Sequence, residues 1–120
     1  MAGSDLNLIF DAALRIMLTV DRSISIRFTE HAINVKLPTT RRLADFLEMP
    51  HYYVLPYLGM MEKEELVMRA ERIGIHTTTK GSKVLVDLMY QHYQEEAQTL
   101  LGHTIFDEIR RRTGESDMDG

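Results

Sequence analysis

The sequence predicts a mainly helical α+β fold in a single domain. Apolar residues recur at helical spacing near both ends of the chain, and they alternate with polar residues in two short segments, 24–37 and 66–77. The 120 residues, 44% hydrophobic and 27% charged, have the length and composition of one globular domain. We therefore expect one domain over residues 1–114, followed by a disordered acidic tail over residues 115–120.

The first helix is expected to begin after a cap at Ser4 or Asp5 and to continue to about Val20. Its apolar residues occupy two faces. One face holds Leu6, Ile9, Phe10, Ala13, Met17 and Val20, and the other holds Leu8, Ala12 and Ile16. A helix that is apolar on two faces must bury both of them, and a partner subunit is the simplest cover for the second.

Residues 24–37 are expected to form two short strands, or one strand and an extended arm. Apolar residues alternate with polar ones on both sides of a turn at 29–31, and Pro38 ends the segment. The alternating apolar residues are Ile24, Ile26 and Phe28, then Ile33, Val35 and Leu37.

Two short helices separated by a break are expected next. Thr39 or Thr40 caps the first, which continues to about Glu48, and Met49–Pro50 breaks it because a residue before proline avoids the helical region. The next helix is expected from about Tyr53 to Glu64, with Val54, Leu58 and Met61 on its buried face. Pro56 is tolerated only if this helix begins shortly before it.

A two-stranded hairpin and a long helix complete the expected order. Residues 66–68 and 75–77 are expected as strands joined by a turn at 70–74, and Thr79 caps a helix that continues through Leu101, with Gly102 ending or kinking it. A further short helix is expected from about Thr104 to Arg112. Apolar residues of the long helix recur at close to 3.5 residues, which predicts a homodimer seam, unless both apolar rows pack within one subunit. The seam residues are Val86, Met89 or Tyr90, Tyr93, Ala97, Leu100 and Thr104. Residues 1–20 and 83–112 are thus the expected dimerisation helices.

Several expected elements follow one another in a recognisable order. A threonine-capped helix with LA is followed by a break, a second helix, a charged turn into LV and a strand leading into T-x-K-G. The residues that form this pattern are TTRRLADFLEMPHYYVLPYLGMMEKEELV and, after them, IGIHTTTKGSKVL. In this order the elements resemble the winged helix-turn-helix family of regulators, including its MarR-like, ArsR-like and archaeal groups. The resemblance covers residues 39–85. It implies a dimeric regulator of transcription whose third helix enters the major groove of double-stranded DNA, with the hairpin as a wing beside it.

The cations of this segment agree with that implication. Residues 66–83 carry a net charge of +3, and two arginines open the second helix. The third helix departs from the family pattern, because residues 50–61 contain no lysine or arginine and offer tyrosines and a histidine instead. The expected DNA-binding residues are Arg41, Arg42, His51, Tyr52, Tyr53, Tyr57, Arg69, Arg72, Lys80 and Lys83.

The same third helix supports an alternative, a protein-interaction module anchored by Tyr52, Tyr53, Tyr57 and Met60. Tyrosine and methionine are enriched in the cores of protein interfaces. The formal net charge of −4 is also unusual for a nucleic-acid binder, although residues 1–114 alone carry 14 cations and 15 acidic residues.

Other functions lack a signature in the sequence. There is no cysteine, no glycine-rich phosphate loop and no nucleophile elbow, so we expect neither an enzyme nor a bound cofactor. The five histidines are scattered, and we expect no metal site. No segment has the length of a membrane span, and we expect a cytoplasmic protein.

Overall fold

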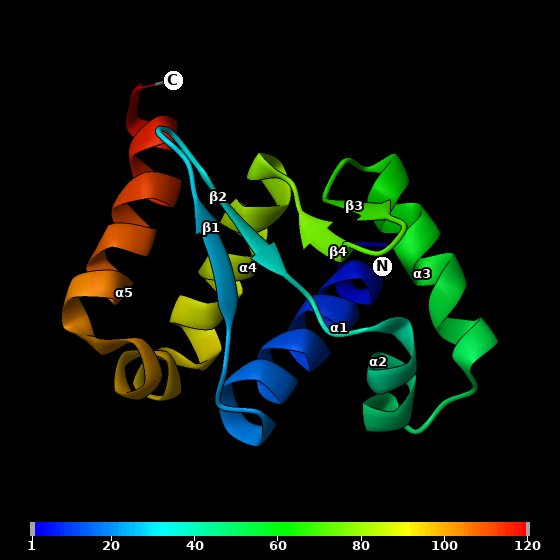
Figure 1. Cartoon of the computed structure of the whole chain (residues 1–120). Coiled ribbons are helices and arrows are strands. Elements are labelled where there is room, and N and C mark those ends of the chain that lie inside the picture. Colours follow the sequence, from blue (N-terminus) through cyan, green and yellow to red (C-terminus); the bar gives the residue numbers. More distant parts are fainter. Residues whose placement is uncertain (1, 120) are drawn as a thin grey trace.

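The computed structural model describes the backbone of residues 2–119 and the side chains of residues 7–114. Within these limits the chain has five α-helices, one π-helical turn and a four-stranded antiparallel sheet, so the predicted α+β class is confirmed (Figure 1). The elements are α1 (Ala2–Arg15), η1 (Ile16–Val20), β1 (Ser25–Phe28), β2 (Ile33–Lys36), α2 (Thr40–Leu47), α3 (His51–Lys63), β3 (Val67–Ala70), β4 (Gly74–Thr77), α4 (Thr79–His92) and α5 (Gln94–Asp119).

The sheet joins the two predicted strand pairs in the order β1-β2-β4-β3. Side chains alternate between the two faces of a strand, and the register therefore assigns each residue to one face. The inner face carries Ile33, Val35, Val67 and Ile75, all buried, and it is covered by α4 and α5 at β2, by α4 at β4 and by α3 at β3. The outer face is open, and Figure 1 shows β1 and β2 lying across α4.

Side-chain hydrogen bonds extend the junction between β2 and β4. The two strands pair at Lys36 and His76, and beyond that pair the Thr77 hydroxyl accepts the Val35 N–H at 2.8 Å. Ser82 of α4 lies 2.7 Å from the same hydroxyl and donates to the Ile33 carbonyl at 2.6 Å. Both hydroxyls are buried, so they join β2, β4 and α4 where a backbone ladder is missing.

Helix α1 lies at the centre of the molecule. Ile9, Phe10, Ala12, Leu14 and Ile16 are all buried, and α1 contacts α2, α3 and α4 of its own chain. Helices of the same chain thus bury Ala12 and Ile16 of the second apolar face and leave Leu8 half-buried, so no partner subunit is needed to explain the burial of this face. The expected cap at Ser4 or Asp5 lies outside the described side chains.

The helical backbone ends at Val20 as predicted, but its last turn is not α-helical. The α-helical part stops at Arg15, and residues Ile16–Val20 form a π-helical turn in which the Asp21 N–H donates to the Ile16 carbonyl at 2.8 Å. The wider turn keeps Ile16, Met17 and Leu18, three consecutive apolar residues, in the core.

Helices α2 and α3 meet at the predicted break. The Thr39 hydroxyl caps α2 by accepting the Arg42 N–H at 3.2 Å, and Glu48 ends it in the left-handed region at a φ of 56°. Helix α3 begins at His51, two residues earlier than predicted, with Pro50 at its N-cap. Pro56 therefore lies inside the helix, where it has no N–H to donate to the Tyr52 carbonyl. Val54, Leu58 and Met61 are buried as predicted.

The hairpin β3–β4 lies close to its predicted place, and α4 follows it directly. The cap of α4 is Thr78 rather than Thr79, because the Thr78 hydroxyl accepts the Gly81 N–H at 3.0 Å. Gly81 lies so close to the chain before β3 that a Cβ would stand 1.8 Å from the Leu66 carbonyl oxygen. Only glycine fits this crossing.

The C-terminal region is a folded-back pair of helices, and the long helix expected to Gly102 was wrong. Tyr93, at φ −135° and ψ 30°, ends α4, and α5 begins at Gln94 (Figure 1). Gly102 is non-helical at φ 80° and ψ 160°, and the helical backbone then continues to Asp119. The segment expected as an acidic tail thus lies at the end of α5, and Gly120 lies outside the described residues.

The apolar rows of these helices are covered within one chain. Val86, Met89 and Ala97 are buried. The Tyr93 hydroxyl donates to Asp11 Oδ1 at 2.5 Å, and the Tyr90 hydroxyl donates to the Phe106 carbonyl at 3.0 Å. The two helical observations that predicted a homodimer are thus explained by packing inside the chain, and the homodimer stays a prediction with no surface assigned to it. None of the described helices has the length and hydrophobicity to cross a membrane.

Candidate nucleic-acid interface

The outward face of α3 is an exposed aromatic ridge. Tyr52 and Tyr53 are 64% and 54% exposed, and their rings meet edge to face with centroids 4.7 Å apart. Tyr57 is half-buried. A hollow of about 420 Å³ lies beside the ridge, lined by Met49, Tyr53, Pro56, Tyr57 and Met60. No lysine or arginine lines it, so this surface offers aromatic contacts and hydroxyl hydrogen bonds rather than charge.

His51 has a structural contact. Its Nε2 lies 2.6 Å from the Thr40 hydroxyl, a hydrogen bond that joins the first turn of α3 to the first turn of α2. One ring nitrogen is thereby occupied, and the ring is half-buried. Of the four α3 residues expected to contact DNA, His51 is the one held most firmly inside the helix pair.

Two of the six expected cations are neutralised by ion pairs. Arg42 forms a two-bond pair with Asp21, with Nη2 2.8 Å from Oδ1, and the hydrogen bond from Arg42 lowers the pKa of Asp21. Arg69 Nη2 lies 2.6 Å from Glu62 Oε1. The sequence contained both carboxylates, but Asp21 is 21 residues from Arg42 and its proximity follows from the fold alone.

The remaining cations lie in different places. Arg41 and Arg72 are exposed and form no ion pair with any described residue. Lys80 donates to the Glu64 carbonyl at 3.0 Å, which holds the start of α4 against the end of α3. Lys83 is half-buried and lines a hollow between α4 and α5 together with Tyr90 and Arg110, so the fold does not bring it to the α3 surface.

A group of polar residues on the outer face of the sheet was missed by the sequence analysis. Arg27, Lys36 and His76 lie there, one on each of β1, β2 and β4. Two adjacent hollows of about 190 Å³ share Arg27, Asn34 and His76, and no carboxylate lines either of them. Alternation in the sequence located the strands, but the pairing of β2 with β4 that assembles this face has no local signal.

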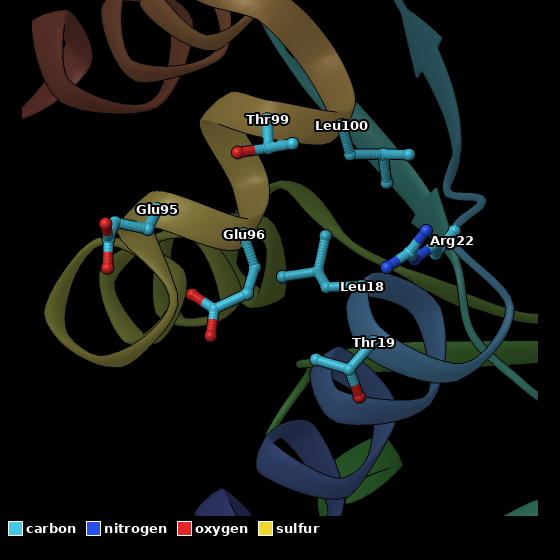
Figure 2. A pocket seen from close by; sticks show the side chains of 7 residues that line it. All are labelled: Leu18, Thr19, Arg22, Glu95, Glu96, Thr99 and Leu100. Atoms are coloured by element: carbon cyan, nitrogen blue, oxygen red, sulfur yellow. The ribbon is translucent and has the colours of Figure 1, made fainter.

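A further hollow, about 540 Å³, lies between η1 and the start of α5. Figure 2 shows Arg22 and Glu96 on opposite sides of Leu18, with Thr19 and Thr99 nearby. Glu95 also belongs to the lining, so two carboxylates accompany one guanidinium. This mixture of charges disfavours a polyanion, and we do not assign nucleic acid to this hollow.

The described residues contain no group of three or more His, Asp or Glu side chains placed to hold a metal ion. Comparison with known proteins finds no matching family model, no matching curated protein and no matching solved structure.

Proposed function

We propose that this chain is a winged-helix domain that binds double-stranded DNA through α3 and the β3–β4 hairpin and acts in the regulation of transcription. The order of the elements along the chain supports this proposal, because α1 is followed by the strands β1 and β2, then by α2, α3 and the hairpin. The contact of β3 with α3 supports it as well. In winged helix-turn-helix proteins the corresponding helix enters the major groove, and the hairpin lies beside it.

The observation that carries the proposal is the distribution of charge around α3. Helix α3 contacts α2 and β3, and the neighbourhood of each contains an exposed arginine, Arg41 in the first turn of α2 and Arg72 in the turn after β3. The ridge itself is uncharged. Cations beside an uncharged ridge suit a duplex, because phosphates flank the groove in which base edges are read.

Each contact has a chemical role in this arrangement. Arg41 and the free N–H groups at the start of α2 bind a phosphate. Tyr52 and Tyr53 provide hydroxyls for base edges or phosphates, and Met60 provides an apolar contact for a thymine methyl. Arg72 reaches the backbone on the hairpin side, so affinity depends on salt through the release of counterions.

Charge reversal tests the proposal. Arg41→Glu and Arg72→Glu, made together, are expected to weaken binding to every duplex sequence alike and to reduce the slope of log affinity against log salt by about two. Arg110→Glu is the matched control, because Arg110 is exposed and stacks on Tyr90 of α4, away from α3. If the double variant binds as tightly as the Arg110→Glu protein, the proposed interface is wrong.

The hollow beside α3 favours a second candidate, a protein-interaction module. Its apolar lining and the exposed Tyr53 and Met60 resemble the aromatic and methionine anchors of protein interfaces. Tyr53→Glu is expected to abolish capture of such a partner at high salt, while Arg72→Glu leaves capture unchanged. Loss of capture in Arg72→Glu alone would contradict docking through the hollow.

A further inference from the structure

We propose that the outer face of the sheet is a second DNA-contacting surface, which holds the sugar–phosphate backbone of the duplex beyond the hairpin. The inference rests on the proposed DNA binding and adds to it a surface outside α2, α3 and the hairpin turn. Its occupant is the same duplex that α3 engages, since β3 and β4 belong both to the hairpin and to this face.

The strand register aligns the polar residues of this face. Ser25 pairs with Lys36, Lys36 with His76, and His76 with Met68, so these four side chains form one row across the sheet. Arg27 and Asn34 form the next row. Neighbouring strands are about 4.8 Å apart, which places Arg27 and Lys36 within about 10 Å of each other.

The Lys36 side chain extends from its own strand toward the hairpin. Its Cε lies 3.6 Å from the position that a Cβ on Gly74 would occupy. Gly74, at a φ of 93°, opens β4 directly after the turn that contains Arg72. The Lys36 side chain therefore reaches over β4 at Gly74, two residues after Arg72 of the hairpin turn.

The charges of this face are available to a ligand. Arg27 and Lys36 are exposed and form no ion pair among the side chains of residues 7–114. By contrast, carboxylates pair with Arg42, Arg69, Arg111 and Arg112. In a chain with a net charge of −4, a face with two free cations and no carboxylate in its hollows is complementary to an anion.

The shape of the face favours an extended anion over a small one. The two hollows are about 190 Å³ each, below the roughly 300–1,000 Å³ of pockets that enclose small molecules. They also adjoin each other, because they share three lining residues. Met68 and Ile73 are exposed at the hairpin side, where they can contact sugars between phosphates. A DNA sugar–phosphate backbone that continues past the hairpin would contact both the hollows and these apolar side chains.

Fluorescence anisotropy with duplexes of two lengths tests the inference. One duplex is about one helical turn long, enough for α3 and the hairpin, and the other is about two and a half turns long. Arg27→Glu and Lys36→Glu, made together, are expected to weaken binding to the long duplex at least tenfold and to reduce its salt slope by about two. Binding to the short duplex is expected to change less than threefold. Arg110→Glu is the charge control, and Arg27→Gln with Lys36→Gln replaces the reversal if that protein does not fold.

The outcomes separate this inference from the proposed function. Unchanged binding of the long duplex, or an equal loss on both duplexes, would overturn the second surface. In that case sensitivity to Arg41→Glu and Arg72→Glu would still support DNA binding through α3 and the hairpin. Absence of binding by the unmodified protein at low salt would overturn both.

Discussion

Arg69 of β3 is held by Glu62 of α3, with Nη2 and Oε1 2.6 Å apart. The register places Arg69 on the inner side of the sheet, opposite Ile75, and its guanidinium reaches the last turn of α3. This ion pair fixes the hairpin against α3. It also removes from the proposed interface a charge that the sequence assigned to DNA.

Glu62→Gln is expected to tighten DNA binding. Release of Arg69 adds one cation to the hairpin and removes one carboxylate, so the affinity should rise several-fold and the salt slope should increase by about one. Both side chains are about one-third exposed, and the stability cost should stay below about 1 kcal/mol. Anisotropy measures the affinity and a thermal melt the stability. Weaker binding by a fully folded Glu62→Gln protein would contradict this role.

Thr77→Val is expected to lower the free energy of unfolding by about 2 kcal/mol. The substitution keeps the shape of the side chain but leaves the buried Val35 N–H and the Ser82 hydroxyl without the Thr77 oxygen. Thr99→Val is the control, because Thr99 is exposed at the surface of α5. Urea denaturation compares the two proteins. Equal midpoints would show that the Thr77 hydroxyl does not stabilise the junction of β2 and β4.

Gly81→Ala is expected to destabilise the folded protein, and Gly59→Ala is expected to stabilise it. A Cβ at Gly81 meets the Leu66 carbonyl 1.8 Å away, so the backbone must shift, at a cost of about 3 kcal/mol. A Cβ at Gly59, inside α3, meets nothing within 4 Å, and alanine there should stabilise the helix by about 0.5–1 kcal/mol. Thermal melts give both values. A neutral Gly81→Ala would contradict the close crossing of α4 over the chain before β3.

The raised pKa of the Tyr93 hydroxyl predicts that the protein loses stability in alkali. Burial, assisted by the hydrogen bond to Asp11, raises the pKa of Tyr93 in the folded protein. Its stabilising contribution is complete below the unfolded pKa of about 10, and it declines as pH rises above that value because only the unfolded chain ionises readily. Tyr90, whose pKa burial also raises, adds to the same decline.

Tyr93→Phe separates this contribution from that of Tyr90. The variant should lose about 1 kcal/mol at pH 7 with the hydrogen bond, and its stability should fall less steeply between pH 9 and 11. Tyr52→Phe is the control, because Tyr52 is exposed on α3. Parallel slopes for the unmodified protein and Tyr93→Phe would contradict a half-buried phenol that stays protonated in the folded protein.

Local patterns predicted the elements well where the cause of the structure is local. Alternation located β1, β2, β3 and β4 within about two residues, and Thr39 and the Met49–Pro50 break located α2. The start of α3 was misplaced because Pro56 suggested a later beginning, whereas Pro50 at the N-cap sets it. Tyr93 carries no helix-ending signal, and its contact with Asp11 lies 82 residues away in the chain.

The sequence did not reveal which residues far apart in the chain contact one another in the fold. The row of Val86, Met89 and Ala97 indicated a buried face, but periodicity does not distinguish a second subunit from other elements of the same chain. The pairs Arg42–Asp21 and Arg69–Glu62 likewise depend on how helices and strands meet. The same limit concealed Arg27 and Lys36, whose strands were predicted while the face they share was not.

The most direct test of the account is fluorescence anisotropy of a labelled, mixed-sequence duplex about two and a half turns long with the purified, folded protein at low and moderate salt. With Arg27, Lys36, Arg41 and Arg72 on phosphates, the slope of log affinity against log salt should be about −3.6, so affinity should fall about a hundredfold between 50 and 200 mM salt. No binding at 50 mM salt, or binding that salt does not weaken, would contradict DNA recognition by this domain.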